Sequence, residues 1–264
     1  MATGKKFERI AGELRAQIRS GELSPGAKLS AETKLAEEHA TSVPTVRQAL
    51  ALLQSEGMIE KEHGRGNFVR RPRRMVTRSN DRHQWEKDRV TADLDVRSSA
   101  GSTEHDTGLD VDALVFSAKY TRVRADAEVA DALGLEQGAP VLERIYRTWH
   151  RDERSPFNLV RSYMPIDLIT SNPALLDEAN EPWPGGTQNQ LHTVGIELDR
   201  VVERVTARPP TAEEFDELDL SVGIAVMVIE KSSIDTNGRV ADWSEIVLPG
   251  DRTASVFTTK LERW

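Results

Sequence analysis

A predicted helix followed by a glycine-flanked arginine constrains the fold of this chain more than any other feature. The run Ser42-Val43-Pro44-Thr45-Val46-Arg47-Gln48-Ala49-Leu50 predicts a helix that extends to about residue 55. Ser42 is a good N-cap, and Pro44 is tolerated in the first turn because no hydrogen bond is lost there. Residues 58–61 and 67–69 predict two strands joined around Gly64-Arg65-Gly66. The segment therefore predicts a helix followed by a β-hairpin.

Two more helices are expected before this element. Ile10, Leu14 and Ile18 recur every four residues, which predicts an amphipathic helix over residues 6–20. A shorter helix is expected over 31–38. Three helices followed by a hairpin describe a winged helix-turn-helix, in which the recognition helix enters the DNA major groove with its N-terminus first. The sequence therefore predicts a DNA-binding module.

The side chains at the start of the recognition helix suit contacts with DNA. Thr45 is short enough to bond a phosphate or a base edge, and Arg47 can donate two hydrogen bonds to a guanine. Arg65, at the hairpin tip, can reach a phosphate or the minor groove. A threonine and an arginine on one helix are more often solvated surface, so the prediction rests on the ordered set of elements.

Residues 7–70 resemble the N-terminal domain of the GntR family of bacterial regulators. The resemblance is carried without gaps by the segments 18–26, 29–32, 35–36, 45–50, 53–59 and 64–69. It implies that DNA is contacted by Lys34, Ser42, Pro44, Thr45, Arg47, Arg65 and Gly66. Two positions depart from the family pattern. Ser30 stands where a proline is usual, and Lys34 stands where an arginine is common, so Lys34 would bind phosphate as a point charge.

The charge distribution supports a local contact with DNA. Residues 1–75 hold 14 Lys and Arg against 9 Asp and Glu, a net charge of +5, whereas the whole chain carries −8. Residues 76–264 therefore carry −13, which argues against a general nucleic-acid coat. The arginine-rich run 70–74 is either a solvated linker or a source of extra phosphate contacts.

The remaining composition excludes several classes of protein. The absence of cysteine excludes disulfides and thiolate metal sites. No apolar run approaches membrane length and no signal peptide is evident, so we expect a cytosolic protein. The six histidines lack metal-ligand spacing, and the common catalytic motifs are missing. We therefore expect neither an enzyme nor a cofactor.

A length of 264 residues suits two domains. Residues 76–110 are poor in large apolar residues and rich in Arg, Asp, Ser and Thr, which predicts a partly extended interdomain linker. The expected parts are a DNA-binding domain over 1–75, this linker over 76–110, and a second domain over 111–264.

An internal repeat organises the second domain. A shift of 85 residues aligns Ala127 with Ala212, Leu133 with Leu218, Gly138 with Gly223 and Val141 with Val226. Each copy predicts a helix, a glycine turn and two strands joined by a polar turn. Asp126 is expected to begin the first helix, and Thr211 the second, in a capping box with Glu214.

The strands make the expected fold α+β, a winged helix-turn-helix followed by an antiparallel sheet with helices. In the two copies we expect strands at 141–149, 157–163, 225–235 and 240–248, the last two joined at Asn237-Gly238. Further strands are expected at 115–120, 198–206 and 256–261.

These strands distinguish two subfamilies of GntR regulators. An all-helical second domain would indicate the FadR-like class. The long strands instead resemble the UTRA effector-binding domain of the HutC-like subfamily, whose fold is similar to chorismate lyase. The segments 161–165, 186–187 and 250–252 lie where that domain has its recurring motifs, and 181–188 is similar to the streptomycete branch.

The resemblance implies a small-molecule effector between the sheet and the loop near Thr187. Arginines and loop N–H groups suit a phosphate or a carboxylate, so an anionic effector is expected. The candidate contacts are Arg144, Arg147, Thr187, Gln188 and Asp242. Val160 and Leu248 depart from the subfamily, in which an acidic residue and a tyrosine are frequent. From the residues alone, Arg144 and Arg147 could instead form ion pairs on the strand face.

The expected activity is that of a homodimeric repressor. Two Arg47-bearing helices, about one DNA turn apart, would read a palindrome. An effector would favour a dimer geometry that no longer matches this spacing. The resemblance also implies half-sites rich in GT and AC, and control of the protein's own operon. Two alternatives stay open: a dimeric repressor of the plasmid type that needs no ligand, and a lyase-like enzyme.

Overall fold

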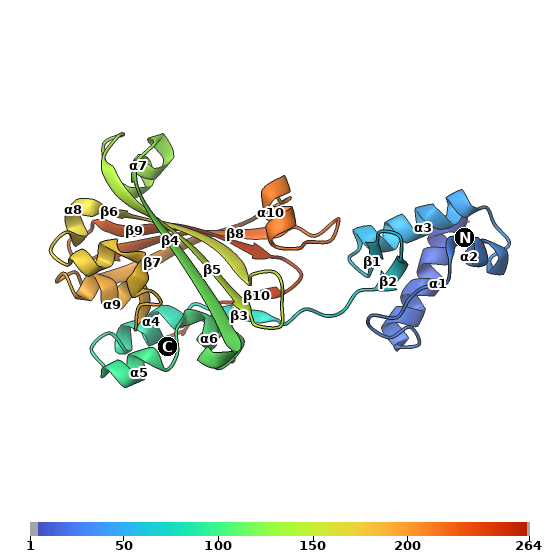
Figure 1. Cartoon of the computed structure of the whole chain (residues 1–264), viewed down its shortest axis with the longest axis horizontal. Coiled ribbons are helices and arrows are strands. Elements are labelled where there is room, and N and C mark those ends of the chain that lie inside the picture. Colours follow the sequence, from blue (N-terminus) through green and yellow to red (C-terminus); the bar gives the residue numbers. More distant parts are fainter. Residues whose placement is uncertain (1–4, 263–264) are drawn as a thin grey trace. The chain divides into compact units, whose positions relative to one another are not determined.

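The computed structural model describes residues 5–262, which divide into two compact units (Figure 1). The first unit holds the chain up to residue 74 together with the short stretches 209–215 and 220–225. The second unit holds 75–208, 216–219 and the chain from 226 onward.

The N-terminal part consists of three helices and a hairpin, as predicted. Its elements are α1 (Lys6–Ser20), α2 (Glu32–Glu38), α3 (Val43–Ser55), β1 (Ile59–Glu62) and β2 (Gly66–Val69). One core joins them, and its buried side chains include Ile10, Leu14, Leu35, Val46, Leu50, Leu53, Ile59 and Val69. This shared core stabilises helices that would be marginal in isolation, because each buries its apolar stripe against the others.

The hairpin is fastened to the helices by a segment that the sequence analysis missed. β1 and β2 pair in antiparallel fashion. The Gly26 N–H donates to the Val69 carbonyl at 2.8 Å, and the Leu29 N–H donates to the Asn67 carbonyl at 2.9 Å. Residues 26–29 therefore line β2 on the side away from β1 and fix the base of the wing.

The second unit is built around a six-stranded antiparallel sheet with the order β4-β5-β6-β9-β8-β7. The strands are β4 (Leu114–Arg124), β5 (Pro140–His150), β6 (Asn158–Pro165), β7 (Leu198–Arg208), β8 (Val226–Asp235) and β9 (Val240–Pro249). The predicted α+β fold is confirmed, and the central strands lie close to their predicted bounds. β6 and β9 pair at the middle of the sheet, with Ser162 opposite Ser244.

The repeat in the sequence is also a repeat in the structure. Phe116 lies opposite Thr148 where β4 pairs with β5. Val201 lies opposite Ser233 where β7 pairs with β8, so each partner is displaced by the same 85 residues. The two copies therefore share one strand register and join through β6 and β9.

The helices of the repeat begin as predicted. α7 (Ala127–Leu133) is capped by Asp126, whose carboxylate accepts from the Val129 N–H at 2.9 Å. Before α10 (Ala212–Glu217), the Thr211 hydroxyl accepts from the Glu214 N–H at 3.2 Å. Glu214 in turn accepts from the Thr211 N–H at 2.8 Å, which completes the capping box.

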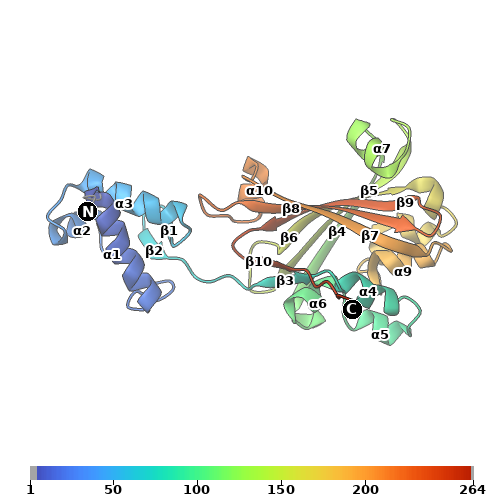
Figure 2. The same cartoon turned by 180° about the vertical axis from the view of Figure 1, so that it is seen from behind.

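Different helices cover the two faces of the sheet (Figures 1 and 2). α7 packs on one face, against Val141, Tyr163 and Trp243. On the other face, α8 (Ile166–Ile169) and α9 (Gly186–His192) pack around Leu142 and Met164. We call this second side the α9 face. Short 3-10 turns complete the unit at η1 (Val111–Ala113), η2 (Pro173–Leu176) and η3 (Glu178–Asn180).

The segment predicted as a linker is folded. It contains β3 (Val76–Ser79), α4 (Arg82–Asp88), α5 (Leu94–Ser98) and α6 (Ser102–Thr107), and β3 pairs in parallel with β10 (Thr253–Val256). An Arg82 nitrogen lies 2.6 Å from Asp106, and an Arg78 nitrogen lies 2.9 Å from Glu203 on β7. The linker prediction is wrong for 76–107, because buried ion pairs here take the place of the missing apolar side chains.

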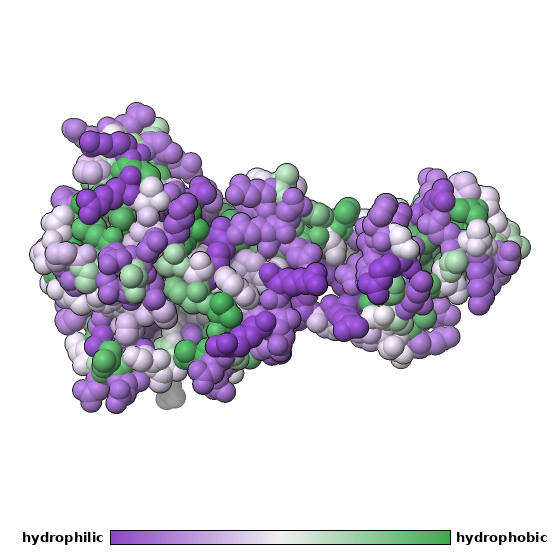
Figure 3. Space-filling model, viewed as in Figure 1, coloured by the Kyte–Doolittle hydropathy of each residue, from purple (hydrophilic) through white to green (hydrophobic). Residues whose placement is uncertain are grey.

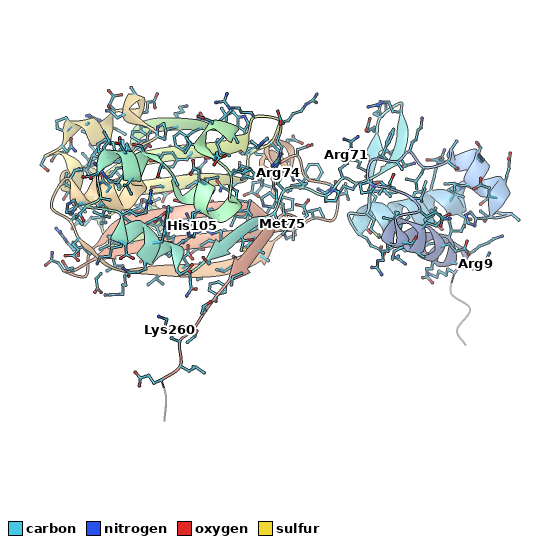
Figure 4. The ribbon with its side chains drawn as sticks, turned by 90° about the horizontal axis from the view of Figure 1, so that it is seen from below. Arg9, Arg71, Arg74, Met75, His105 and Lys260 are labelled. Carbon is cyan, nitrogen blue, oxygen red and sulfur yellow. The ribbon has the colours of Figure 1, made fainter. Side chains whose placement is uncertain are left out.

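The stretch that links β2 to β3 without helix or strand is shorter than the predicted linker. Between β2 and β3, residues 70–75 have neither helix nor strand, and Figure 4 labels Arg71, Arg74 and Met75 along this stretch. The strand predicted at 256–261 is also wrong. β10 ends at Val256, and the tail that carries Lys260 in Figure 4 is irregular.

Candidate nucleic-acid interface and ligand pocket

The start of α3 presents the predicted DNA-contacting groups to solvent. Ser42, Pro44 and Arg47 are exposed, and Thr45 is half-buried. The hydroxyls of Ser42 and Thr45 lie 2.9 Å apart, and Ser42 Oγ also accepts from the Thr45 N–H at 3.4 Å. The N-cap therefore orients Thr45 while its neighbours stay accessible.

Arg47 forms an exposed ion pair whose carboxylate DNA can replace. Its side chain is 66% exposed, and its Nε donates to Glu32 on α2 at 2.6 Å. Lys34 is similarly exposed and lies 3.8 Å from Glu38. Exposed pairs of this kind contribute only about 0–1 kcal/mol, so a phosphate or guanine can compete for either cation.

The wing places a second cationic group at its tip. Arg65 is exposed, forms an ion pair with Glu62 and lies 5.5 Å from the centre of the Phe68 ring. Lys28 lies 5.9 Å from the same ring. Gly66 has φ of +120°, and a Cβ there would lie 3.2 Å from Lys28 Cε. The structure therefore adds Lys28 to the wing, where only its pairing with β2 could have revealed it.

The predicted pocket residue Arg144 lies at the centre of the α9 face. It is 1% exposed, and it donates to Ser162 Oγ at 2.6 Å, to Gln190 Oε1 at 2.7 Å and to Asp242 Oδ1 at 2.8 Å. The side chain is thus fully engaged within the protein. The ion-pair alternative for Arg144 matches this geometry.

Asp242 is the predicted residue that pairs with Arg144. It is fully buried, it accepts from Ser162 and Ser244 at 2.5 and 3.1 Å, and it lies 3.5 Å from Lys231. Burial by itself raises the pKa of this carboxyl, but Lys231, Arg144 and the hydroxyls outweigh burial and lower it. Asp242 is therefore an anion inside the sheet face.

Arg147 is separated from this cluster. Residues three apart on a strand point to opposite faces, so Arg147 lies on the face away from Arg144. Its side chain pairs with Glu217. The two arginines cannot line one pocket, which corrects the prediction for Arg147.

The predicted loop residues lie on α9. Thr187 is half-buried in the first turn. Gln188 is buried, but its amide donates to the His83 carbonyl at 2.8 Å and to Glu86 at 3.3 Å, which directs it towards α4. Gln190 is the residue of α9 that reaches Arg144. Gln188 was predicted rather than Gln190, because a helix as short as α9 has too few residues for its pattern to show which side faces the sheet.

Three further polar residues surround Arg144 that the sequence analysis missed. Tyr120 on β4 and Tyr146 on β5 have hydroxyls 3.0 Å apart, and both contact the carboxylate of Glu181. Glu181 belongs to the loop before α9. The period of two along β5 places Tyr146 on the face of Arg144, so that residue could have been found from the sequence.

Neither a metal centre nor a membrane segment emerges from the described chain. No group of three or more His, Asp or Glu side chains within residues 5–262 is arranged to hold a metal ion. Over the same residues, every helix is too short or too polar to cross a bilayer. The side of the surface drawn in Figure 3 is largely hydrophilic, with its hydrophobic residues in small groups.

Comparison with known families and proteins assigns a family to each part of the chain. Residues 117–254 match the UTRA domain, and residues 6–69 match the bacterial regulatory proteins of the gntR family. An HTH-type transcriptional regulator of Streptomyces coelicolor is 27% identical, over 97% of this chain and 93% of its own length. The transcriptional repressor NagR of Bacillus subtilis is 25% identical, over 93% of this chain and 91% of its own length.

Solved structures show the same fold. A GntR-family transcriptional regulator aligns with a TM-score of 0.66 at 24% identity, over 98% of this chain and 99% of its own. PhnF from Mycobacterium smegmatis aligns with a TM-score of 0.51 at 20% identity, over 96% of this chain and all of its own.

Proposed function

The chain belongs to the GntR family of bacterial regulators that carry a UTRA domain, the build of the HutC-like subfamily, and we propose that it is a homodimeric repressor released from its operator by a small anionic effector. Members of this family regulate transcription, so the chain is a DNA-binding regulator and not an enzyme. Because its partner is DNA, we place it in the cytoplasm.

The observation that carries the proposal is the exposed set of polar and cationic groups on the DNA-binding domain. Arg47 at the start of α3 and Arg65 at the wing tip are paired only with exposed or half-exposed carboxylates. In a helix-turn-helix, the corresponding groups read the major groove and fix the duplex. Arg47 reads a base in this proposal, Lys34, Ser42, Pro44 and Thr45 position the helix on the backbone, and Arg65 and Gly66 contact DNA beside it.

The family relationship supports the proposed repression and dimerisation. The relatives include proteins named as repressors, among them NagR of Bacillus subtilis and MngR of Escherichia coli, the latter 40% identical over 25% of this chain. Two copies of α3 about one DNA turn apart would read a palindromic operator. The effector shifts the equilibrium because it binds the DNA-incompetent dimer more tightly than the competent one.

The α9 face is the proposed effector site. Gln190, Tyr120 and Tyr146 supply hydrogen-bond donors there, Arg144 holds the amide of Gln190, and Thr187 lies in the first turn of α9. Such donors suit a carboxylate or a phosphate. Asp242 acts in this proposal by holding Arg144 in place.

Operator binding tests the proposal directly. The full chain is titrated against the DNA upstream of its own gene and against a scrambled duplex of equal length, at physiological salt. We expect a preference of about a thousandfold or more for the upstream DNA. Equal, salt-sensitive binding to both duplexes would contradict control of its own promoter, and no binding to either would contradict the DNA-binding assignment.

The same assay then screens effectors. Compounds with carboxylate or phosphate groups are added to the operator complex, and loss of binding is recorded. If no anionic compound lowers operator affinity while the protein represses a reporter in cells, the ligand-independent mode of repression replaces the effector-responsive one.

A further inference from the structure

The carboxylate of Glu181 occupies a set of donors that the protein itself provides. One carboxylate oxygen of Glu181 accepts from the hydroxyls of Tyr120 and Tyr146, the latter at 3.0 Å, and from Gln190 Nε2 at 2.8 Å. The other oxygen accepts from the Trp183 N–H at 2.7 Å. Four donors around one carboxylate form a site for an anion.

These donors belong to the proposed effector pocket. Gln190 donates to Glu181 through its amide nitrogen and accepts from Arg144 through its amide oxygen at 2.7 Å. Burial raises the pKa of Tyr120 to about 12 and raises that of Tyr146 well above its ordinary value, so both hydroxyls keep their protons at neutral pH. The two tyrosines therefore act as donors to whichever anion lies there.

The carboxylate of Glu181 also interacts with the charge of Arg144. Burial by itself lowers the pKa of Arg144, but Tyr146, Asp242, Tyr120 and Glu181 outweigh burial and raise it. An anion that takes the place of Glu181 would therefore lie in the same favourable field of Arg144.

The loop that carries Glu181 is attached to β4 at two points. Besides the contact between Glu181 and the Tyr120 hydroxyl, Glu178 accepts from the Tyr120 backbone N–H at 2.6 Å. Glu178 thus covers the unpaired edge of β4 and makes no bond to the Tyr146 hydroxyl or Gln190. It resembles Glu181 in charge and position but not in role.

Building on the proposed function, we propose that Glu181 is an internal occupant of the anion subsite of the effector pocket. The carboxylate or phosphate group of the effector takes its place on Tyr120, Tyr146 and Gln190. The expelled Glu181 leaves the loop before α9 attached to β4 through Glu178 alone. Effector binding therefore changes the conformation of this loop.

Chemical rescue tests the subsite without knowledge of the effector. Glu181→Ala in the full chain removes the occupant and leaves its donors in place. We expect acetate and inorganic phosphate, added separately at constant ionic strength, to raise the Tm of this variant in a saturable way. The variant should bind the better anion at least about tenfold more tightly than wild type, because the carboxylate of Glu181 occupies the same donors in wild type.

Two variants serve as matched controls. Glu178→Ala removes the same charge from the same loop but vacates no donor cluster, so neither anion should stabilise it beyond wild type. Adding Tyr146→Phe to Glu181→Ala removes one donor and should abolish most of the rescue. If Glu181→Ala does not fold, Glu181→Ser replaces it, since serine keeps a polar side chain at this position but is too short to occupy the donors.

The outcomes separate the two anion types and decide the proposal. Rescue by acetate identifies a carboxylate subsite, and rescue by phosphate alone identifies a phosphate subsite. Equal stabilisation of all variants, or rescue by ethylammonium instead of an anion, would overturn the proposal. Because Tm is read without DNA, failure here is distinct from failure of operator binding.

Discussion

Arg144 and Asp242, 98 residues apart in the chain, meet at 2.8 Å on the α9 face with both side chains 1% exposed. The strands that carry them belong to different copies of the repeat and are joined only through β6. This pair therefore links the two halves of the sheet at the proposed effector site, and it explains why Arg144 is held in place rather than free to move.

Asp242→Ala tests how much this pair contributes to the free energy of unfolding. Removing one partner leaves a buried charge uncompensated, which costs about 3–5 kcal/mol in comparable cases. Urea denaturation of the full chain, followed by tryptophan fluorescence, measures the change in the free energy of unfolding. Arg204→Ala is the control, because Arg204 pairs with Glu230 on the surface, where solvent screens the pair, and its loss should cost far less than the loss of Asp242. Equal effects of the two substitutions would contradict the assignment of Asp242.

Arg47→Ala should weaken binding to the operator by about 1–3 kcal/mol and relax the base preference at one position of each half-site. The physical reason is the loss of a forked donor to a guanine in the major groove. Binding isotherms against a set of single-base operator variants measure both effects. Arg9→Ala provides the comparison, since Arg9 is an exposed arginine of α1 paired with Glu13 and labelled in Figure 4. A loss of affinity that is uniform across all sequences would make Arg47 a phosphate contact.

Acid should destabilise the second unit through Glu203. Burial alone would raise the pKa of this carboxyl, but His83, whose Nε2 lies 3.2 Å away, and the charges of Arg78 and Arg82 lower it to about 2. Because the folded pKa lies below the unfolded value of about 4.3, the stabilisation is present above that value and is lost as the pH falls towards 2. The free energy of unfolding should therefore drop by about 2–3 kcal/mol across this window.

Denaturation curves at several pH values check this dependence. Glu203→Gln should be less stable than wild type at pH 7, and its stability should change less between pH 5 and pH 2. An unchanged slope in this variant would assign the acid sensitivity to other carboxylates whose pKa the fold lowers, such as Glu86 or Asp242.

Limited trypsin digestion should distinguish a folded 76–107 segment from an extended linker. Arg74 lies in the irregular stretch 70–75 and is exposed, so cleavage is expected after it. The bond after Arg71 resists trypsin because Pro72 follows it. Arg78 and Arg82 are 7% and 6% exposed and are bound to carboxylates, so they should resist. Mass spectrometry of the early fragments locates the cuts, and early cleavage after Arg78 or Arg82 would contradict the folded segment.

The local elements were predictable because their signals are local. The i, i+4 spacing of Ile10, Leu14 and Ile18 specifies the buried side of α1, and Ser42 marks the start of α3. The separation of 85 residues predicted one unit of helix and strands that occurs twice, and the strand register confirms the repeat. Each of these predictions depends on residues close to one another in the sequence or on a direct comparison of two segments.

The prediction for residues 76–107 was wrong because the signals that fold this segment are not local. Its low apolar content indicated an extended chain, yet Arg78 and Arg82 are buried against Glu203 and Asp106. Buried ion pairs have no sequence period, because their partners lie on elements whose proximity is set by the sheet. The strand at 256–261 was misplaced because a short parallel pair with β3 has no pattern of its own.

The amino-acid sequence by itself determined the two-part architecture, the recognition helix with its exposed Arg47, and the repeated helix and strands of the UTRA domain. Only the tertiary structure decided that Arg144 is neutralised by Asp242, that Gln190 rather than Gln188 reaches it, and that Glu181 lies on the two tyrosines. The periodicity of apolar residues shows which side of a helix or strand is buried. The partners of a buried charge depend on which strands and loops come together, and that choice minimises the free energy of the whole fold rather than of any one segment.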